Sequence, residues 1–205
     1  MPPVTAALVL LNVGVFVQQS FAPALTVSLA LWPIGGAWLF VPQAGFAPYQ
    51  VVTYAFLHGS VPHLMFNMLG LYMFGGPLER ALGPKRFVLY YLACVVSAAV
   101  TQLVVLGIAG TFVPTVGASG GVFGLLLAYA VMFPHHRIML LFPPIPMPAR
   151  RFAVLYAGIE LALGIVGTSS GVAHFAHLGG MIGGVLLLRG WRVRAVPAEA
   201  GERAG

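Results

Sequence analysis

Two polar side chains in apolar surroundings have the types that acyl-transfer chemistry requires. Ser119 lies in the sequence Gly117-Ala118-Ser119-Gly120, and His177 lies in a later apolar segment that is rich in glycine. An imidazole beside a serine hydroxyl accepts its proton as the oxygen attacks a carbonyl carbon, and later returns that proton to the leaving amine. Ser119 and His177 therefore predict a nucleophile and its general base, provided that their segments pack together.

Small residues indicate that the two segments do pack together. They recur every four positions in both: Gly120, Gly124 and Ala128 in the first segment, and Gly180 and Gly184 in the second. Small residues at this spacing let helix backbones approach closely in a membrane. Close packing of the two stripes would bring the Ser119 hydroxyl towards the His177 imidazole.

His63 and Asn67 supply further polar groups in another apolar segment. Their four-residue spacing places both side chains on one helix face. Together with the backbone N–H of Ser119, at the end of a glycine-containing loop, they could donate hydrogen bonds to a developing oxyanion. The alternative is that the pair forms hydrogen bonds between helices and only stabilises their packing.

The other polar residues in the apolar segments are interpreted as structural. Glu160 is expected to be protonated or hydrogen-bonded within the protein, and the less favoured alternative is that it orients a catalytic histidine. His174 is expected to face an outer loop, and Cys94 to pack inertly. A serine flanked by glycines at a helix start is also often an N-cap, so the case for Ser119 depends on its partner.

The composition is that of an integral membrane protein. The 205 residues are 60% hydrophobic and 7% charged, with a mean hydropathy of +0.96, whereas soluble domains carry about 25% charged residues. The chain has no Asp, which excludes a Ser-His-Asp triad and Asp-based metal cages, and one cysteine, which excludes disulfides and Cys-rich zinc sites. No Glu neighbours any of the six histidines, so the H-E-x-x-H pattern is absent and a site-2 type metalloprotease is excluded as well. We expect no metal and no cofactor.

The apolar runs predict an all-α membrane protein with six transmembrane helices in residues 1–190, followed by a short cytoplasmic tail of residues 191–205. A helix needs about 20 residues to cross an apolar layer of about 30 Å. The six runs are separated by breaker clusters and lie at about 4–22, 62–79, 87–108, 119–134, 151–168 and 174–189. Residues 23–56, with aromatic side chains scattered among Pro and Gly, are expected to form a long structured loop in the membrane interface.

The basic residues predict which side of the membrane each terminus faces. All ten follow the second, fourth or sixth run: Arg80, Lys85 and Arg86; Arg137, Arg150 and Arg151; and Arg189, Arg192, Arg194 and Arg203. The positive-inside rule then places both termini in the cytoplasm. Three separate clusters do not form the continuous basic surface that nucleic acid requires, so no nucleic-acid partner is expected. Nine Arg to one Lys, with abundant Ala and Gly, indicates a GC-rich genome and hence a bacterial cytoplasmic membrane.

Helix length places the serine inside the apolar layer. The 16 residues of the run at 119–134 reach only about 24 Å, so the loop before this run must dip below the outer surface. Ser119 would then begin a helix whose N-terminus is sunk in the membrane.

Three motifs occur in order on the second, fourth and sixth runs: His63-x-x-x-Asn67, Gly117-x-Ser119-Gly120, and Ala176-His177-x-x-Gly180-x-x-x-Gly184. This set resembles the rhomboid intramembrane serine proteases over about residues 49–190, and Glu79-Arg80 with Gly83 is a further common feature of that family. The resemblance implies a six-helix rhomboid-like bundle that works through a Ser-His dyad. Ser119 would be the nucleophile, His177 the general base, and His63 and Asn67 the oxyanion contributors beside the Ser119 N–H.

Two positions depart from the family pattern. Many members have a Trp-Arg pair in the first long loop where this chain has Tyr49-Gln50, and a Tyr often packs against the catalytic imidazole where this chain has Phe123. A phenyl ring can still pack on the imidazole but offers no hydroxyl. Neither change removes a group that transfers a proton.

The resulting hypothesis is hydrolysis of peptide bonds in or beside the transmembrane segments of other membrane proteins. Those proteins and membrane lipid are the expected partners. The alternative is a non-proteolytic membrane chaperone or helix-binding protein that uses the same groove. A small transporter fits poorly, because the chain shows no internal repeat.

Overall fold

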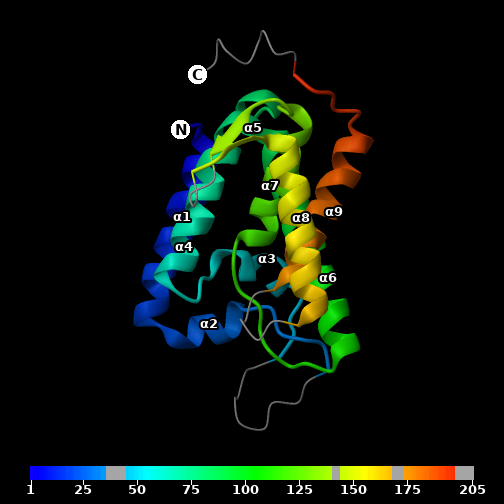
Figure 1. The fold of residues 1–205 in the computed structure, drawn as a ribbon. Helices are drawn as coiled ribbons and strands as arrows, with labels where there is room; N and C mark the ends of the chain where they lie inside the picture. The colour runs from blue at the N-terminus through cyan, green and yellow to red at the C-terminus, as the bar shows by residue number, and fades with distance from the viewer. Residues whose placement is uncertain (36–44, 140–143, 168–172, 197–205) are drawn as a thin grey trace.

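The computed structural model describes residues 1–35, 45–139, 144–167 and 173–196, which fold into a bundle of helices (Figure 1). The longer helices are α1 (Pro3–Phe21), α4 (Val61–Gly70), α6 (Pro84–Ala109), α7 (Ser119–Met132), α8 (Ala149–Val166) and α9 (His174–Gly190). Each of the six apolar runs recognised in the sequence is therefore helical. The described chain begins and ends near the same end of the bundle (Figure 1). The expected tail lies outside the described residues beyond position 196.

The second run forms a longer helical stretch than expected, over residues 61–82. α4 continues through a π-helical segment, η2 (Leu71–Gly75), into α5 (Gly76–Leu82). At its start the Ser60 hydroxyl accepts a hydrogen bond from the backbone N–H of His63 at 3.2 Å, which is a standard N-cap. At its end Gly83 has a φ of 77° and a ψ of 158°, a backbone conformation that favours glycine and separates the stretch from α6.

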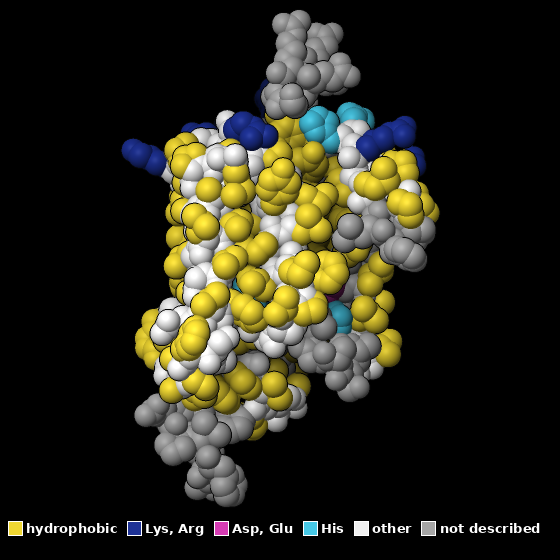
Figure 2. Space-filling view, turned by 90° about the vertical axis from the view of Figure 1, so that its left-hand side faces the viewer, with side chains coloured by type: hydrophobic (Ala, Val, Ile, Leu, Met, Phe, Trp, Pro, Cys, Tyr) yellow, Lys and Arg dark blue, Asp and Glu magenta, His cyan; other side chains and the backbone are white. Residues whose placement is uncertain are grey.

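The sides of the bundle carry mainly hydrophobic side chains, whereas Lys and Arg gather at one end of the face shown in Figure 2. Leu10, Ile108, Ile165 and Leu186 are between 64% and 84% exposed. Such apolar surface is unfavourable in water and suits contact with lipid. Among the described helices, α1 and α6 are individually long and apolar enough to cross a membrane, and α7 is apolar but shorter.

The segment between α1 and α4 has its own structure where it is described. It contains α2 (Pro23–Leu29), α3 (Gln50–Thr53) and a 3-10 turn, η1 (Tyr54–Phe56), and residues 36–44 lie outside the described part. Gln50 is 1% exposed and holds this segment together. Its Oε1 accepts hydrogen bonds from the backbone N–H groups of Trp32 and Ala47, at 3.2 and 3.1 Å, and its Nε2 donates to the carbonyls of Ser28 and Gly45. The glutamine that departs from the Trp-Arg pattern is thus a buried anchor of the segment.

The centre of the bundle is α7, which packs against α6, α8 and α9. Gly120 of α7 and Gly180 of α9 touch so closely that a Cβ on Gly180 would collide with the Gly120 carbonyl. A Cβ on Gly124 would meet the Cys94 sulfur of α6, which explains why a small buried thiol lies there. The atoms nearest to a Cβ on Gly184 belong to Tyr90 and Cys94 of α6, so this glycine makes room for α6.

Two features near the Lys- and Arg-rich end were not anticipated. A short antiparallel hairpin of β1 (Arg137–Met139) and β2 (Pro146–Pro148) links α7 to α8 where the sequence predicted only a break. Glu79 of α5, which is 3% exposed, accepts hydrogen bonds from the backbone N–H of Val4 and of Thr5 and from the Thr5 hydroxyl. These N–H groups lie in the first turn of α1 and have no partner within the helix, so the carboxylate caps α1 from a neighbouring helix.

Candidate active site

The loop before α7 delivers Ser119 to the first position of that helix. The chain leaves α6, crosses the end of the bundle and rises into it before α7 begins (Figure 1). Gly117 donates its N–H to the Tyr54 carbonyl at 3.0 Å, which ties this loop to η1. Its φ of 131° is strained for any other residue, and a Cβ here would lie 2.8 Å from the His63 ring. Gly117 therefore permits both the turn and the close approach of His63.

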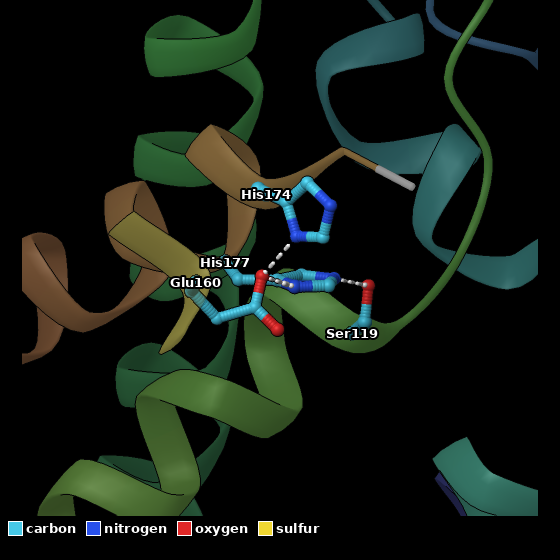
Figure 3. A network of polar contacts seen from close by, with 4 residues as sticks. All are labelled: Ser119, Glu160, His174 and His177. Carbon is cyan, nitrogen blue, oxygen red and sulfur yellow. Dashed lines mark hydrogen bonds and ion pairs between the residues drawn. The ribbon is translucent and has the colours of Figure 1, made fainter. Parts of the chain in front are cut away.

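His177 lies in the first turns of α9, directly against Ser119. Its Nε2 is 2.7 Å from the Ser119 Oγ (Figure 3), and the residue is 7% exposed. The contact between Gly120 and Gly180 explains this approach, because each glycine lies within three residues of one of the two side chains. The structure thus brings together the serine and histidine that the sequence singled out.

Phe123 holds the plane of the His177 ring. The two rings are parallel within 5°, with centroids 4.3 Å apart. Phe123 is one helical turn after Ser119, so the same stretch of α7 supplies both the hydroxyl and the surface on which the imidazole rests. The phenyl ring also packs at an angle against Tyr156 of α8, with centroids 6.4 Å apart.

Glu160 of α8 lies at the edge of the His177 ring opposite Ser119. Its Oε2 is 2.8 Å from the Nδ1 of His177 and 2.7 Å from the Nδ1 of His174 (Figure 3). The expectation that His174 faces an outer loop is wrong, because its side chain is buried in this cluster. The interpretation of Glu160 as a purely structural residue missed its contact with the ring that touches Ser119. The three-residue spacing of His174 and His177, which places both on one helix face, was the available signal.

The carboxylate contact decides which ring nitrogen of His177 carries the proton. Ionised Glu160 offers only lone pairs, and beside it the Nδ1 of His177 is the N–H donor. In the neutral ring Nε2 is then the acceptor, and it is Nε2 that faces the Ser119 hydroxyl. This tautomer is the one that can remove the hydroxyl proton.

His63 and Asn67 line a cavity together with Ser119 and His177. The cavity has a volume of about 950 Å³, and its lining includes Ser119, His177, His63 and Asn67. Asn67 is buried and donates one amide N–H to the His63 carbonyl at 2.9 Å, one turn earlier in α4. The His63 Nδ1 accepts a weaker hydrogen bond from the Gly59 N–H at 3.4 Å. The second amide N–H of Asn67 and the His63 Nε2 edge are the groups available to a ligand.

The cavity lining combines apolar and polar side chains. Leu106, Val116 and Phe123 contribute apolar surface, and Gln102 and Thr115 add polar atoms beyond the residues already named. The volume suits an extended peptide or a comparable ligand, since binding sites of 300–1,000 Å³ are usual.

Glu160, His174 and His177 are also residue types that bind metal ions, and one ligand atom from each lies within 4.8 Å of the others. The distances of 2.7 and 2.8 Å from both Nδ1 atoms to one oxygen are, however, those of direct hydrogen bonds. The arrangement therefore fits a hydrogen-bonded cluster.

Comparison with known proteins places this bundle in a family. A model of the rhomboid domain matches residues 46–193. Rhomboid protein 1, mitochondrial, of Saccharomyces cerevisiae is 31% identical over 185 residues, which cover 84% of this chain and 52% of that protein. The Bacillus subtilis rhomboid protease GluP is 31% identical over 137 residues, which cover 66% of this chain and 24% of that protein. The Klebsiella pneumoniae rhomboid protease GlpG is 29% identical over 127 residues, which cover 62% of this chain and 42% of that protein.

The chain spans about half the length, or less, of these relatives. The matched region nevertheless contains every helix from α4 to α9, including all the residues that line the site. With its apolar sides and helical bundle, the chain belongs to the rhomboid family of integral membrane proteins.

Proposed function

We propose that this protein is a serine endopeptidase that hydrolyses peptide bonds in or beside the transmembrane segments of other membrane proteins. The observation that carries the proposal is the 2.7 Å approach of the Ser119 Oγ to the His177 Nε2 at the wall of a large cavity. The bacterial relatives GluP and GlpG bear the name of rhomboid proteases, which supports the same class of activity.

In the first half of the reaction, the Ser119 Oγ attacks the scissile carbonyl carbon while its proton moves to the His177 Nε2. The carbonyl π electrons move to the oxygen, which becomes an oxyanion. When this intermediate collapses, the C–N bond breaks and the Nε2 proton goes to the leaving amine. The acyl group stays on Ser119 as an ester.

In the second half, a water molecule replaces the amine. The His177 Nε2 removes a proton from the water, the hydroxide oxygen attacks the ester carbon, and Ser119 leaves with the proton returned. The products are a new amino terminus and a new carboxyl terminus. The cavity beside Ser119 is the space in which the water and the unwound substrate meet.

The oxyanion would be stabilised by donors that line the cavity. Ser119 is the first residue of α7, so its N–H has no acceptor within the helix and lies at the positive end of the helix dipole. Asn67 and His63 contribute side-chain donors from α4, in the lining of the same cavity. The donors of such sites are worth most where charge develops in the transition state.

The six helical segments would each cross the membrane, with both termini in the cytoplasm. The α4-to-α5 stretch has 22 residues over 61–82, enough to span, and α7 has 14 residues, about 21 Å, which leaves Ser119 below the outer surface. Lys and Arg gather at one end of the bundle (Figure 2), the end at which α5 lies in Figure 1. The site would therefore open towards the outer face.

The partners would be transmembrane proteins and the surrounding lipid. The composition favours a bacterial cytoplasmic membrane, and the relatives include both bacterial and mitochondrial proteins. In either membrane the same physical constraint applies. A substrate helix must unwind locally before it can present a peptide bond to Ser119, since helical amides are hydrogen-bonded and shielded.

A serine-directed phosphonate probe tests the proposal on the full chain in detergent. We expect labelling of the parent protein, loss of labelling in Ser119→Ala, and cleavage of a single-span substrate whose product can be sequenced from its new N-terminus. If neither labelling nor cleavage depends on Ser119, the protein is not a serine protease. Substrate capture without cleavage would then favour the helix-binding alternative.

A further inference from the structure

We propose that Glu160 is a positioning residue for the proposed serine protease, and that His174 in turn orients Glu160. The proposal rests on the function proposed above. It extends the pair of Ser119 and His177 by Glu160 and His174 to a chain of hydrogen bonds, which we call the relay. In this relay Glu160 holds His177 in the tautomer that accepts the Ser119 proton. It also places a carboxylate beside the imidazolium that forms during each proton transfer.

The residues of the relay come from three helices, so only the tertiary fold brings them together. Ser119 begins α7, Glu160 lies in α8, and both histidines lie in the first turns of α9. Figure 3 shows the carboxylate on one side of the His177 ring and the Ser119 hydroxyl on the other. The two contacts use opposite nitrogens of one ring, Nδ1 at 2.8 Å and Nε2 at 2.7 Å. A carboxylate on one nitrogen and a nucleophile on the other is the geometry in which an acid orients a general base.

The direction of the hydrogen bonds is set by the chemistry of the groups. Glu160 Oε2 can only accept when ionised, so both His177 and His174 must present Nδ1–H to it. Without such an acceptor a neutral imidazole can also adopt the tautomer that carries its proton on Nε2. That tautomer would point an N–H at the Ser119 oxygen and could not remove its proton.

The role of His174 follows from the surroundings of the carboxylate. Glu160 is 8% exposed and lies in the part of α8 that follows Arg150 and Arg151 and is otherwise free of charged residues, and a buried carboxylate is costly unless hydrogen bonds satisfy it. His174 supplies a second N–H to the same oxygen at 2.7 Å. With both bonds in place the carboxylate cannot rotate away from His177 without losing two partners. His174 thus acts on the imidazole through Glu160 and not by direct contact with a substrate.

A merely structural role of Glu160 and His174 would require fewer contacts than the structure has. A tie between α8 and α9 needs only one hydrogen bond, and the pair of His174 with Glu160 would provide it. It would not require the carboxylate to reach the particular ring that touches Ser119. Phe123 already fixes the plane of that ring, with 5° between the two planes, so what Glu160 adds is the choice of the protonated nitrogen.

The first experiment compares Glu160→Gln with the parent chain in the same detergent. The substituted amide can turn its NH₂ group towards Nδ1 and so select the wrong tautomer of His177, a change that costs about 10⁴-fold in kcat in the well-studied serine protease triad. We expect kcat for a single-span substrate, and the rate of phosphonate labelling, to fall between about 10²- and 10⁴-fold. KM and the melting temperature should change little, because the amide preserves size and hydrogen-bonding capacity.

The second measurement reports the tautomer itself. Ring nitrogen chemical shifts of ¹⁵N-histidine-labelled protein distinguish Nδ1–H from Nε2–H, and His177→Ala assigns the signal. We expect His177 as the Nδ1–H form in the parent and a shift towards Nε2–H in Glu160→Gln. His174→Gln should retain Nδ1–H on His177 and lose less than about tenfold in kcat, because the direct bond between Glu160 and His177 remains. Glu160→Asp should recover part of the activity lost in Glu160→Gln.

Glu79→Gln is the matched control, since Glu79 is also a buried, hydrogen-bonded carboxylate but caps α1 and lies outside the cavity lining. It should lower the melting temperature, because both Glu79 oxygens accept hydrogen bonds and the amide nitrogen of Gln cannot accept one, and it should leave kcat per folded molecule unchanged. The relay is overturned if Glu160→Gln labels and cleaves at the parental rate, or loses activity only in proportion to unfolding, or leaves the tautomer of His177 unchanged. Absence of Ser119-dependent labelling in the parent would instead overturn the protease assignment, and the tautomer measurement would still test the contact of Glu160 with His177.

Discussion

Replacing Gly180 with alanine should separate α7 from α9 and pull His177 away from Ser119. A Cβ on Gly180 would collide with the carbonyl of Gly120, which belongs to helix backbone and cannot rotate aside. Ordinary Cβ contacts begin near 3.4 Å, so the helices must move apart on the order of 1 Å, a displacement large enough to cost about 10²-fold in rate.

The effect on the site can be followed atom by atom. The Ser119 Oγ is 2.7 Å from the His177 Nε2, and a further 1 Å or so would take the pair beyond about 3.5 Å, where a hydrogen bond is lost. Overpacking of this kind also costs about 1–3 kcal/mol of stability. We expect Gly180→Ala to lose about 100-fold in kcat and to melt at a lower temperature.

The assay is cleavage of a single-span substrate together with thermal melting, both in the same detergent. Gly14→Ala in α1 is the matched control, because a Cβ there meets nothing within 4 Å. It should leave kcat unchanged and keep or slightly raise stability, since alanine is the better helix former. Parental kcat and melting in Gly180→Ala would refute the close helix contact. Lost activity at unchanged stability would mean that Gly180 serves the substrate path instead.

Three further predictions test the rest of the site. Ser119→Ala, His177→Ala and the double variant should all fall to a similar residual rate, because nucleophile and base act in one step, and multiplicative losses in single-turnover assays would argue against the pair. Asn67→Ala and His63→Ala should each lower kcat by about 10²–10³-fold with little change in KM if they stabilise the oxyanion. A structural role predicts instead a loss of about 0.6–2 kcal/mol of stability with full kcat per folded molecule, which melting curves measured beside kcat would reveal. A reporter fused after residue 205 should behave as cytoplasmic, and an external signal would refute the six-span topology.

The positions of the helices could be predicted from the sequence because membrane helices are encoded locally. Each run of apolar residues between Gly and Pro clusters became a helix, with ends that differ from the expectation by only a few residues. Backbone groups in lipid must bond within their own segment, so an apolar run of sufficient length has few alternatives to a helix. The hairpin of β1 and β2 is the exception, since strands of three residues each have too little periodicity to detect.

The serine and the histidine of the site could also be predicted from the sequence. The glycine spacing of the fourth and sixth runs pointed to a close contact, and Gly120 and Gly180 make it. A stripe of small residues can be recognised in the sequence, because the helix that packs against it needs only a similar stripe. Ser119 and His177 were singled out by their residue types, and the glycine spacing predicted that their segments meet, since Gly120 follows Ser119 directly and Gly180 lies three residues after His177.

The rest of the site depended on how the helices are rotated about their axes. Whether Glu160 faces lipid, α7 or α9 is decided by the packing of α8 against its neighbours, and no spacing within α8 records that angle. The same holds for Gln50, whose four hydrogen bonds join residues from 28 to 47 along the chain. The sequence by itself determined which segments are helices, which two approach closely, and which serine and histidine they carry. Only the tertiary structure decided that a glutamate and a second histidine complete the cluster, because hydrogen bonds between helices follow from side-chain directions in space.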